Sequence, residues 1–244
     1  MKKGLVAKTD QKARVFSLQT SVSEMVLGGK RDAKEVADAL QVIKNHRDFA
    51  KRLGLAVTST LNLDPDTERQ LKEWQTLYRE LFGQEKDFSA LKIPERKEGV
   101  TRLIVVAQGM NPNRIFNKLK ELMPAWKYRD NLDSITSIRK TDQDYAVWIR
   151  DRVEADEELK NKSVNELEQS KSITLEERLL LEIKYFRETG KHLDVENITF
   201  CAGSRDSGGS VPFVDWRRWR GGVNVDRYNP GNAGGDFRSR LVVS

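Results

Sequence analysis

Residues 198–225 read ITFCAGSRDSGGSVPFVDWRRWRGGVNV and contain the pattern that decides the fold. Pairs of apolar residues, each separated by one position, alternate here with turns rich in glycine, asparagine and proline. The pairs are Ile198/Phe200, Val211/Phe213 and Val223/Val225, and a fourth pair, Leu241/Val243, follows them. A period of two is typical of half-buried strands. The stretch therefore predicts a small antiparallel sheet with long loops.

The residues before this stretch predict strands and helices in alternation. Residues 100–107 (VTRLIVVA) and 145–149 (YAVWI) have the β-branched and aromatic composition of buried strands. Between them, Asn111 and Pro112 start a helix, because a cap residue followed by proline favours the first helical turn. Apolar residues then recur at helical spacing until Pro124 ends the pattern.

A capping box opens a second helix in this region. Thr174 and Glu177 have the spacing at which each side chain bonds the other residue's backbone amide, and Gly190 marks the end of the pattern. The second half of the chain is therefore predicted to be an α+β domain in which two helices brace a small antiparallel sheet.

Two further helices are predicted in the first half. The apolar spacing indicates one over residues 31–53 and another over residues 64–83, the latter with Asp64 as its N-cap. Residues 1–29 are expected to be a loosely structured lead-in, and the charged stretch 92–99 has the composition of a linker.

The domain boundary is expected within this linker. It separates a helical N-terminal region, residues 1–95, from the C-terminal domain, residues 96–244. Several roles for the N-terminal region stay open. It could attach the C-terminal domain to a partner, mediate self-association, contact nucleic acid through its Lys-rich first 54 residues, or pack as a helical cap.

Composition sets broad limits on the protein class. The chain has 244 residues, a net charge of +6 and 38% hydrophobic residues, as in a polar globular protein. Contact with nucleic acid is allowed but not required, because 37 acidic residues lie among the basic ones. No apolar run is long enough to span a bilayer, and the start, MKKGLVAK, predicts no signal peptide. The single cysteine fits a reducing cytoplasm.

Residues 201–244 use a restricted set of amino acids. They contain no Lys, Glu, Gln, Met, His or Thr, so every cation is Arg and every anion is Asp. Replacement of the adenines in AAC or AAT codons yields many residue types but never Lys, Glu, Gln, Met or Trp. The absence of the first four fits such a process, with Trp216 and Trp219 fixed. A loop-rich β region is also poor in Lys and Glu.

No motif indicates catalysis. His46 and His192 lack a Cys, Ser or Asp partner in a catalytic arrangement, and we interpret each as a solvated residue at a helix end. Cys201 is interpreted as a small buried apolar residue. We therefore expect a protein that is not an enzyme and that has no cofactor.

Two regions offer oxygen ligands for a metal. The carboxylates of residues 151–158 lie among Arg150, Arg152 and Lys160, which favours a salt-bridged, solvated surface. The loop 229–236 (NPGNAGGD) has groups that calcium prefers, although turn chemistry explains the same residues. We expect no metal site, and calcium binding by this loop stays open.

The C-terminal half resembles a known group of proteins. The segments FCAGSRDSGGSVPFVDW (200–216), GDFRSR (235–240), YAVWIRDRVEADEE (145–158) and TGKHLD (189–194) are similar to those of the variable proteins of diversity-generating retroelements. The resemblance covers roughly residues 100–244. It implies a C-type-lectin-like fold related to the formylglycine-generating-enzyme type, with codons rewritten by a reverse transcriptase over about residues 203–238. With one cysteine, it implies binding and not catalysis.

The resemblance divides the tail into a fixed scaffold and a variable ligand-binding surface. The scaffold would contain Val214, Trp216, Val223, Val225, Phe237, Leu241 and Val243, with Gly203 and Ser204 shaping a turn and Arg238 and Arg240 paired with internal carboxylates. The candidate ligand-binding residues are Asp206, Ser210, Phe213, Asp215, Arg217, Arg218, Arg220, Asn224, Asp226, Arg227, Asn229 and Asn232. Arg, Asp and Asn favour a polar or charged ligand, most simply another protein.

Nucleic acid is the alternative partner. Arg217, Arg218 and Arg220 interleave with Trp216 and Trp219, and arginine with aromatic residues serves both phosphate contact and base stacking. The same residue types are also preferred at protein-binding surfaces, because they give large contact area at low ordering cost. Composition alone does not separate the two partners.

Overall fold

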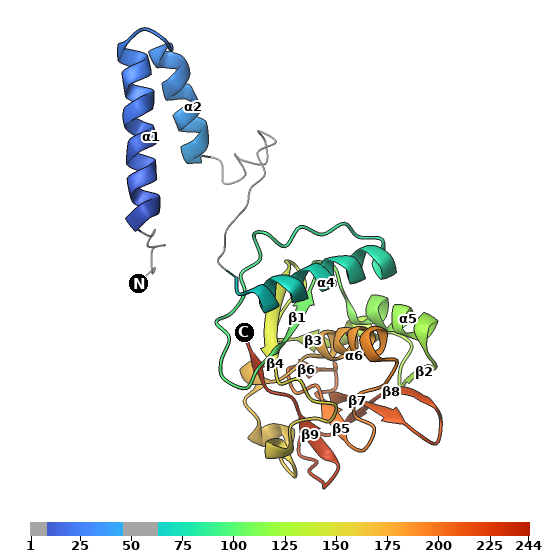
Figure 1. Ribbon diagram of the computed structural model, residues 1–244. Helices are drawn as coiled ribbons and strands as arrows, with labels where there is room; N and C mark the ends of the chain where they lie inside the picture. The colour runs from blue at the N-terminus through green and yellow to red at the C-terminus, as the bar shows by residue number, and fades with distance from the viewer. Residues whose placement is uncertain (1–8, 46–62) are drawn as a thin grey trace. The chain divides into compact units, whose positions relative to one another are not determined.

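The computed structural model of the protein describes residues 9–45 and 63–244. The chain divides into two compact units, residues 1–59 and residues 60–244. Helices and strands are labelled in Figure 1.

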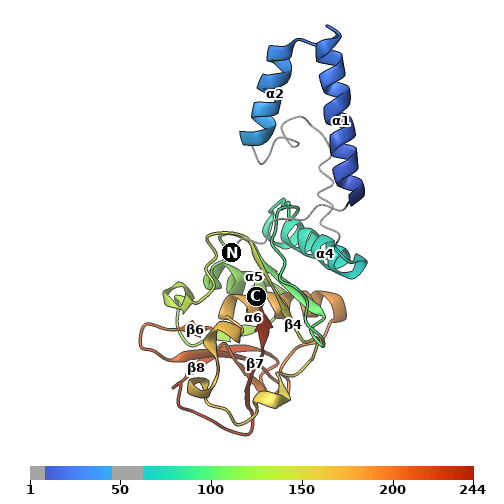
Figure 2. The same ribbon diagram turned by 90° about the vertical axis from the view of Figure 1, so that its left-hand side faces the viewer.

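The N-terminal unit contains two helices that lie side by side (Figure 1, Figure 2). They are α1 (Thr9–Leu27) and α2 (Ala33–Asn45). Gly29, with φ of 66°, takes the left-handed conformation in the turn, and the N–H of Lys30 donates to the carbonyl of Met25 at 2.8 Å. No side chain among residues 17–41 is buried.

Helix α1 differs from the expected loose lead-in at residues 1–29. Leu18, Val22 and Met25 recur at spacings of four and three, so a helical pattern was present that the expectation of a loose lead-in missed. The helix predicted at residues 31–53 is confirmed over α2. Its later part, including His46, lies outside the described residues.

A three-stranded antiparallel sheet begins the C-terminal unit. Its order is β1 (Arg102–Val106), β4 (Tyr145–Ile149) and β10 (Val242–Val243). Both predicted strands, at residues 100–107 and 145–149, are therefore confirmed. The pairing of β10 with β4 joins the last residues of the chain to the middle of the unit.

Helix α4 (Pro65–Phe82) lies along the free edge of β1. The Gln70 side chain accepts the N–H of Leu103 at 2.8 Å, and the Trp74 indole donates to the Leu103 carbonyl at 2.9 Å. One turn later, the Tyr78 hydroxyl donates to the Val105 carbonyl at 2.7 Å. Side chains of a helix thus occupy backbone groups that would otherwise be available to another strand.

The position of α4 corrects the predicted domain boundary. The units divide at residue 59 and not at residue 95, so α4 belongs with the C-terminal unit. The charged stretch 92–99 is not a free linker. Arg96 pairs with Asp66 at 2.8 Å, and the Trp148 indole donates to the Pro94 carbonyl at 3.0 Å. Charged composition is shared by linkers and by such salt-bridged connections.

Local cap chemistry explains the helix ends. Asp64 accepts the N–H of Thr67 at the start of α4, and Gly83, with φ of 62°, ends it. The remaining long helices, α5 (Pro112–Leu122) and α6 (Leu175–Thr189), contact each other. The predicted starts of both are confirmed, including the capping box of Thr174 and Glu177.

A five-stranded sheet carries the tail. Its order is β2 (Ala125–Lys127), β8 (Gly222–Tyr228), β7 (Val211–Arg217), β5 (Ile198–Phe200) and β9 (Phe237–Ser239). The sheet is mixed, because β2 pairs with β8 and β5 with β9 in parallel. The expectation of a purely antiparallel sheet is wrong for these pairs, whose strands are distant in sequence.

Several short elements complete the unit. They are η1 (Leu132–Ser134), η2 (Glu157–Leu159), η3 (Val164–Glu166), η4 (Gln169–Lys171), and the paired strands β3 (Thr136–Ser137) and β6 (Ser204–Arg205). In both views, α5 and α6 lie between α4 and the five-stranded sheet (Figure 1, Figure 2). The combination of helices and sheets confirms the α+β class.

Two apolar clusters form the core. The larger one joins α4, α5, α6 and both sheets, and it contains the expected scaffold residues Val214, Val223 and Val225. The smaller one lies on the other side of the five-stranded sheet, around Phe200 and Phe213. Within the described residues, no helix has both the length and the apolar character needed to cross a membrane.

Candidate functional site

Strands β7 and β8 form a hairpin whose two faces differ. Val214 faces Val225 across the strands, and both are buried in the larger cluster. On the opposite face, Asp215 lies across from Asn224, whose side chain donates to the Asp215 carboxylate at 3.2 Å. Alternation along β8 thus separates the core residues Val223 and Val225 from Asn224, whereas β7 has buried residues on both of its faces.

Trp126 of β2 forms the floor of the hairpin tip (residues 217–222). A Cβ at Gly222 would lie 2.2 Å from the Trp126 ring and 2.5 Å from the Pro124 carbonyl oxygen. Only glycine therefore fits beneath this ring. Gly221, with φ of 64°, turns the chain just before it.

Arg220 lies against two indole rings at the hairpin tip. Its guanidinium carbon is 4.3 Å from the centroid of a Trp126 ring and 5.7 Å from that of Trp219. Trp219 itself is 78% exposed. Cation–π contacts of this kind orient the guanidinium plane without using its N–H donors.

Neighbouring arginines are paired with carboxylates. Arg217 bonds Asp215 at 2.7 Å, and Arg218 pairs with the exposed Glu196. Burial raises the pKa of the Asp215 carboxyl, although Asn224 and Arg217 oppose this shift. The tip therefore carries mixed charge and not a continuous cationic strip.

Asp206 organises the loop at the other end of the hairpin. One of its oxygens accepts the N–H groups of Gly208 and Ser210 at 2.9 Å each, and the other accepts from Arg227 at 2.8 Å. Burial alone raises the pKa of Asp206, but the hydrogen bonds from Arg227, Ser210 and Gly208 outweigh it and lower that pKa overall. The carboxylate is a structural part of the loop.

The predicted ligand-binding residues separate by exposure. The buried ones are Asp206, Phe213 and Asp215, the partly buried ones are Ser210, Arg217, Asn224 and Asp226, and the exposed ones are Arg218, Arg220, Arg227, Asn229 and Asn232. An exposed contact role for Phe213 is wrong. It is 2% exposed and packs edge-on against Phe200, because a second apolar cluster covers that end of the sheet.

The predicted residues also separate in space. Arg217 and Gly222 pair at the tip, whereas Val211 and Tyr228 pair at the open end of the hairpin. Six residues of strand span about 20 Å, so the tip and the open end are separate surfaces. At the open end, Asn229 accepts the N–H of Gly231 at 3.2 Å, as in a turn.

Of the three residues considered for catalysis, Cys201 and His192 lie within the described residues, and both have structural environments. Burial raises the pKa of the Cys201 thiol well above its ordinary value, which disfavours the reactive thiolate. His192 is not a solvated residue as expected. It stacks between Phe186 and Trp216, and its Nδ1 lies 3.0 Å from the Glu182 carboxylate.

A buried ion network holds the chain near its last strand. Arg240 bonds Asp194 at 2.6 Å, and Arg178 bonds the same carboxylate at 2.8 Å. Burial alone raises the pKa of Asp194, yet the charges of Arg240 and Arg178 lower it overall. The expected pairing of Arg240 with an internal carboxylate is thus confirmed. Arg238 instead pairs with Glu157, whose side chain is mostly exposed.

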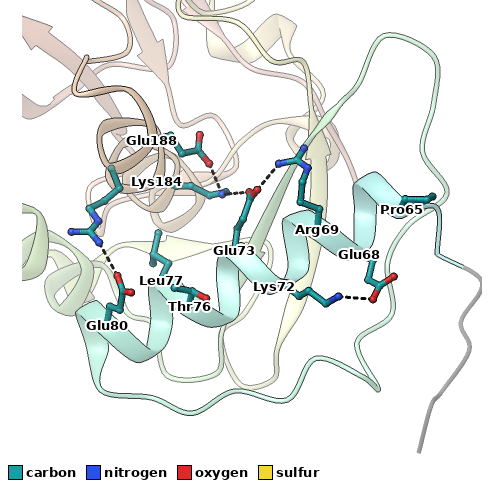
Figure 3. Close-up of a pocket in the computed structure, with 11 residues that line it drawn as sticks. Pro65, Glu68, Arg69, Lys72, Glu73, Thr76, Leu77, Glu80, Lys184 and Glu188 are labelled. Carbon is teal, nitrogen blue, oxygen red and sulfur yellow. Dashed lines mark hydrogen bonds and ion pairs between the residues drawn. The ribbon is translucent and has the colours of Figure 1, made fainter.

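A groove of about 650 Å³ between α4 and α6 is a second candidate (Figure 3). Its charged side chains neutralise one another: Lys184 lies between Glu73 and Glu188, and Arg187 bonds Glu80 at 2.7 Å. These pairs join the two helices. They leave no carboxylate–base pair arranged around a reacting position, so the groove has no catalytic geometry.

The carboxylates at residues 151–158 also have structural partners. Glu154 accepts the backbone amides of Val195 and Asn197, and the buried Asp156 accepts from Arg150 and from the amide of Leu241. The expected salt bridges are confirmed, since Arg150 pairs with Asp156 and Arg152 with Glu158, but the expected solvation is wrong for Asp156, which is buried. Within the described part of the chain, no group of three or more His, Cys, Asp or Glu residues could hold a metal ion.

No family model, curated protein or solved structure matches this chain. Trp126 is the site residue that sequence reasoning missed. The pair of glycines at positions 221 and 222 was the one available sign of a close approach by another group.

Proposed function

We propose that this protein is a diversified ligand-binding protein of a diversity-generating retroelement, with a C-type-lectin-like C-terminal domain. Its exposed tail side chains would contact a polar ligand, most simply another protein. The sequence resemblance and the restricted amino-acid composition of residues 201–244 motivate this function.

The distribution of tail side chains is the observation that supports it best. In β8, buried Val223 and Val225 alternate with the partly buried Asn224 and Asp226, whereas β7 is buried from Val211 to Asp215. Arginines at the tip, such as Arg218 and Arg220, are exposed. Exchange of exposed side chains costs little stability, whereas exchange of core residues costs several kcal/mol. Such a hairpin tolerates variation on its surface.

The anchoring of the chain beyond the hairpin is a second supporting observation. Strand β9 pairs with β5, β10 pairs with β4, and Arg240 bonds the buried Asp194. These contacts hold the backbone on both sides of the proposed variable stretch. A fixed frame around a variable surface is what a display domain needs.

Nucleic-acid binding is less well supported. Arg217, Arg218 and Arg227 are each paired with a carboxylate of this chain, which reduces the charge available to phosphate groups. Strong binding to generic DNA or RNA, with affinity falling steeply as salt increases, would favour this alternative.

The test of the proposed function is the nucleotide sequence around the gene. We expect an imperfect repeat of its 3′ end nearby that differs at adenines of the repeat, together with a reverse-transcriptase gene. The mismatched codons should encode exposed residues such as Arg220 and spare buried ones such as Val225. A gene without such a repeat, or mismatches concentrated in core codons, would overturn the proposal.

A further inference from the structure

Arg220 differs from the other arginines of residues 201–244. Arg205 donates to backbone carbonyls, and the others bond carboxylates: Arg217, Arg218, Arg227, Arg238 and Arg240. Within residues 9–45 and 63–244, the Arg220 guanidinium contacts two indole rings and has no ion-pair partner. Its donors are therefore available to a ligand.

The ring beneath Arg220 is held in place. The Trp126 ring and the Pro124 carbonyl oxygen both lie so close to Gly222 that a Cβ at this position would not fit. Its strand, β2, pairs with β8 directly at Asn224. The exposed Arg220 guanidinium lies over this fixed ring, with its carbon 4.3 Å from the centroid, so that its position is restricted before a ligand binds. Less ordering is then required when a ligand binds, which favours affinity.

The exposed edge of a guanidinium matches planar oxyanions. A carboxylate accepts two parallel N–H bonds from it, and such charge-assisted pairs are about twice as strong as neutral hydrogen bonds. Beside this edge, Trp219 is 78% exposed and offers an apolar face. An arginine flanked by tryptophan is the residue combination typical of binding hot spots.

We propose that Arg220, held by Trp126 and Trp219, anchors a single carboxylate side chain of a partner protein. This inference rests on the proposed ligand-binding function and names the chemistry of its ligand. Trp126 acts as a positioning residue from outside the diversified stretch.

The surrounding charges favour a protein carboxylate over a nucleic acid. A hollow of about 220 Å³ beside Trp219 is lined by Glu196, Asp215 and Asp236 as well as by Arg217 and Arg218. A phosphate chain crossing this region would meet these acidic groups. A single carboxylate on a folded partner can approach Arg220 alone, so mixed charge is compatible with it.

The test is a titration of the full chain with a short peptide, monitored by NMR. The probe is the peptide acetyl-Gly-Leu-Glu-Glu-Leu-Gly-amide, and its control has Gln in place of Glu. We expect the Glu peptide to shift the indole N–H signals of Trp126 and Trp219 and the Nε–H signal of Arg220. Buried Trp74 and Trp148 serve as internal references. The Gln peptide should bind at least about tenfold more weakly.

Two variants distinguish specific binding by the Arg220 guanidinium from nonspecific attraction to positive charge. Arg220→Lys keeps the cation but loses the planar fork, and it should weaken Glu-peptide binding about tenfold. Arg129→Lys is the matched control, because Arg129 also lies over a ring, that of Tyr128, at 5.3 Å. Its affinity for the peptide should equal that of the unmodified chain. Equal binding of both peptides, or an Arg220→Lys variant as tight as the control, would overturn the proposed anchor.

A third probe, a single-stranded oligonucleotide, tests whether Arg220 prefers a nucleic-acid phosphate to a protein carboxylate. Tighter binding of the oligonucleotide than of the Glu peptide, with the same shifted signals, would reassign the anchor to nucleic acid and overturn the proposal. Failure of the anchor leaves the gene-repeat test of the function unaffected. Absence of the repeat together with selective Glu-peptide binding would overturn the retroelement function and keep the anchor.

Discussion

Arg220 and Arg240 belong to the same stretch of restricted composition, yet their surroundings are opposite. Arg240 is 1% exposed and bonds the buried Asp194 and two backbone carbonyls. Arg220 is exposed and rests on aromatic rings. The residue type is the same in both regions, so the function of each arginine is set by its partners. The end of the tail, around Arg240, belongs to the buried part of the fold, which we call the frame. The hairpin tip, residues 217–222, belongs to the exposed part, which we call the surface.

The largest effect should come from Arg240→Ala. This change leaves Asp194 buried with half of its cationic partners, and breaking a buried pair typically costs about 3–5 kcal/mol. Urea unfolding would measure the loss in the free energy of unfolding. The comparison is Arg218→Ala, whose ion pair with Glu196 is exposed and should contribute less than about 1 kcal/mol. Equal losses would mean that the frame and the surface are not distinct.

Gly222→Ala should have an intermediate effect. The new methyl group would overlap the Trp126 ring, and overpacking of this kind typically costs about 1–3 kcal/mol. Displacement of the ring should also change the tryptophan fluorescence. Gly235→Ala is the control, because a Cβ there meets no atom within 4 Å. An unchanged melting temperature and spectrum for Gly222→Ala would show that Trp126 is not fixed against the tip.

The pH dependence of stability should differ between variants of Asp206, near the open end of the hairpin, and Asp215, near its tip. The pKa of Asp206 is lowered in the folded protein, so its ionised form stabilises the fold above its ordinary value of 3.8, and this contribution is lost as pH falls below 3.8. Asp206→Asn should therefore cost about 2 kcal/mol at neutral pH and progressively less in acid.

The expected sign is reversed for Asp215. Because its pKa is raised in the folded protein, the carboxyl contributes stability at low pH that is lost as pH rises through the folded pKa. Asp215→Asn should accordingly leave stability at neutral pH unchanged or slightly higher. Urea unfolding at several pH values would compare the two variants. A parallel pH dependence would contradict the assignment of Asp206 to the frame.

Local chemistry made part of this fold predictable. Asp64, Asn111 and the Thr174–Glu177 box start helices in the structure, because caps depend on residues within one turn. Val214 and Val225 were predictable as core residues from a period of two. These signals need no information from distant parts of the chain.

The missed features depend on distant contacts. Strand β2 has three residues, and its parallel pairing with β8 brings Trp126 to the tip from far away in the sequence. Phe213 was misplaced because alternation separates two faces without showing that the smaller apolar cluster covers one of them. Helix α1 is the exception, because the spacing of Leu18, Val22 and Met25 is a local sign of a helix that the expected loose lead-in overlooked.

The smallest expected effect on stability is that of Trp219→Ala, and it is the sharpest test of the surface. The side chain is 78% exposed, and its ring centroid lies 5.7 Å from the guanidinium carbon of Arg220. Loss of so little buried area should change the free energy of unfolding by less than about 0.5 kcal/mol. Binding of the Glu peptide should nevertheless weaken, because truncation of a hot-spot aromatic removes contact area at the ligand. Thermal unfolding and peptide titration of the same sample would give both values. If the Trp219→Ala protein lost stability as well as affinity, Trp219 would be part of the stable frame. The hairpin tip would then not be a surface that can vary independently of the fold.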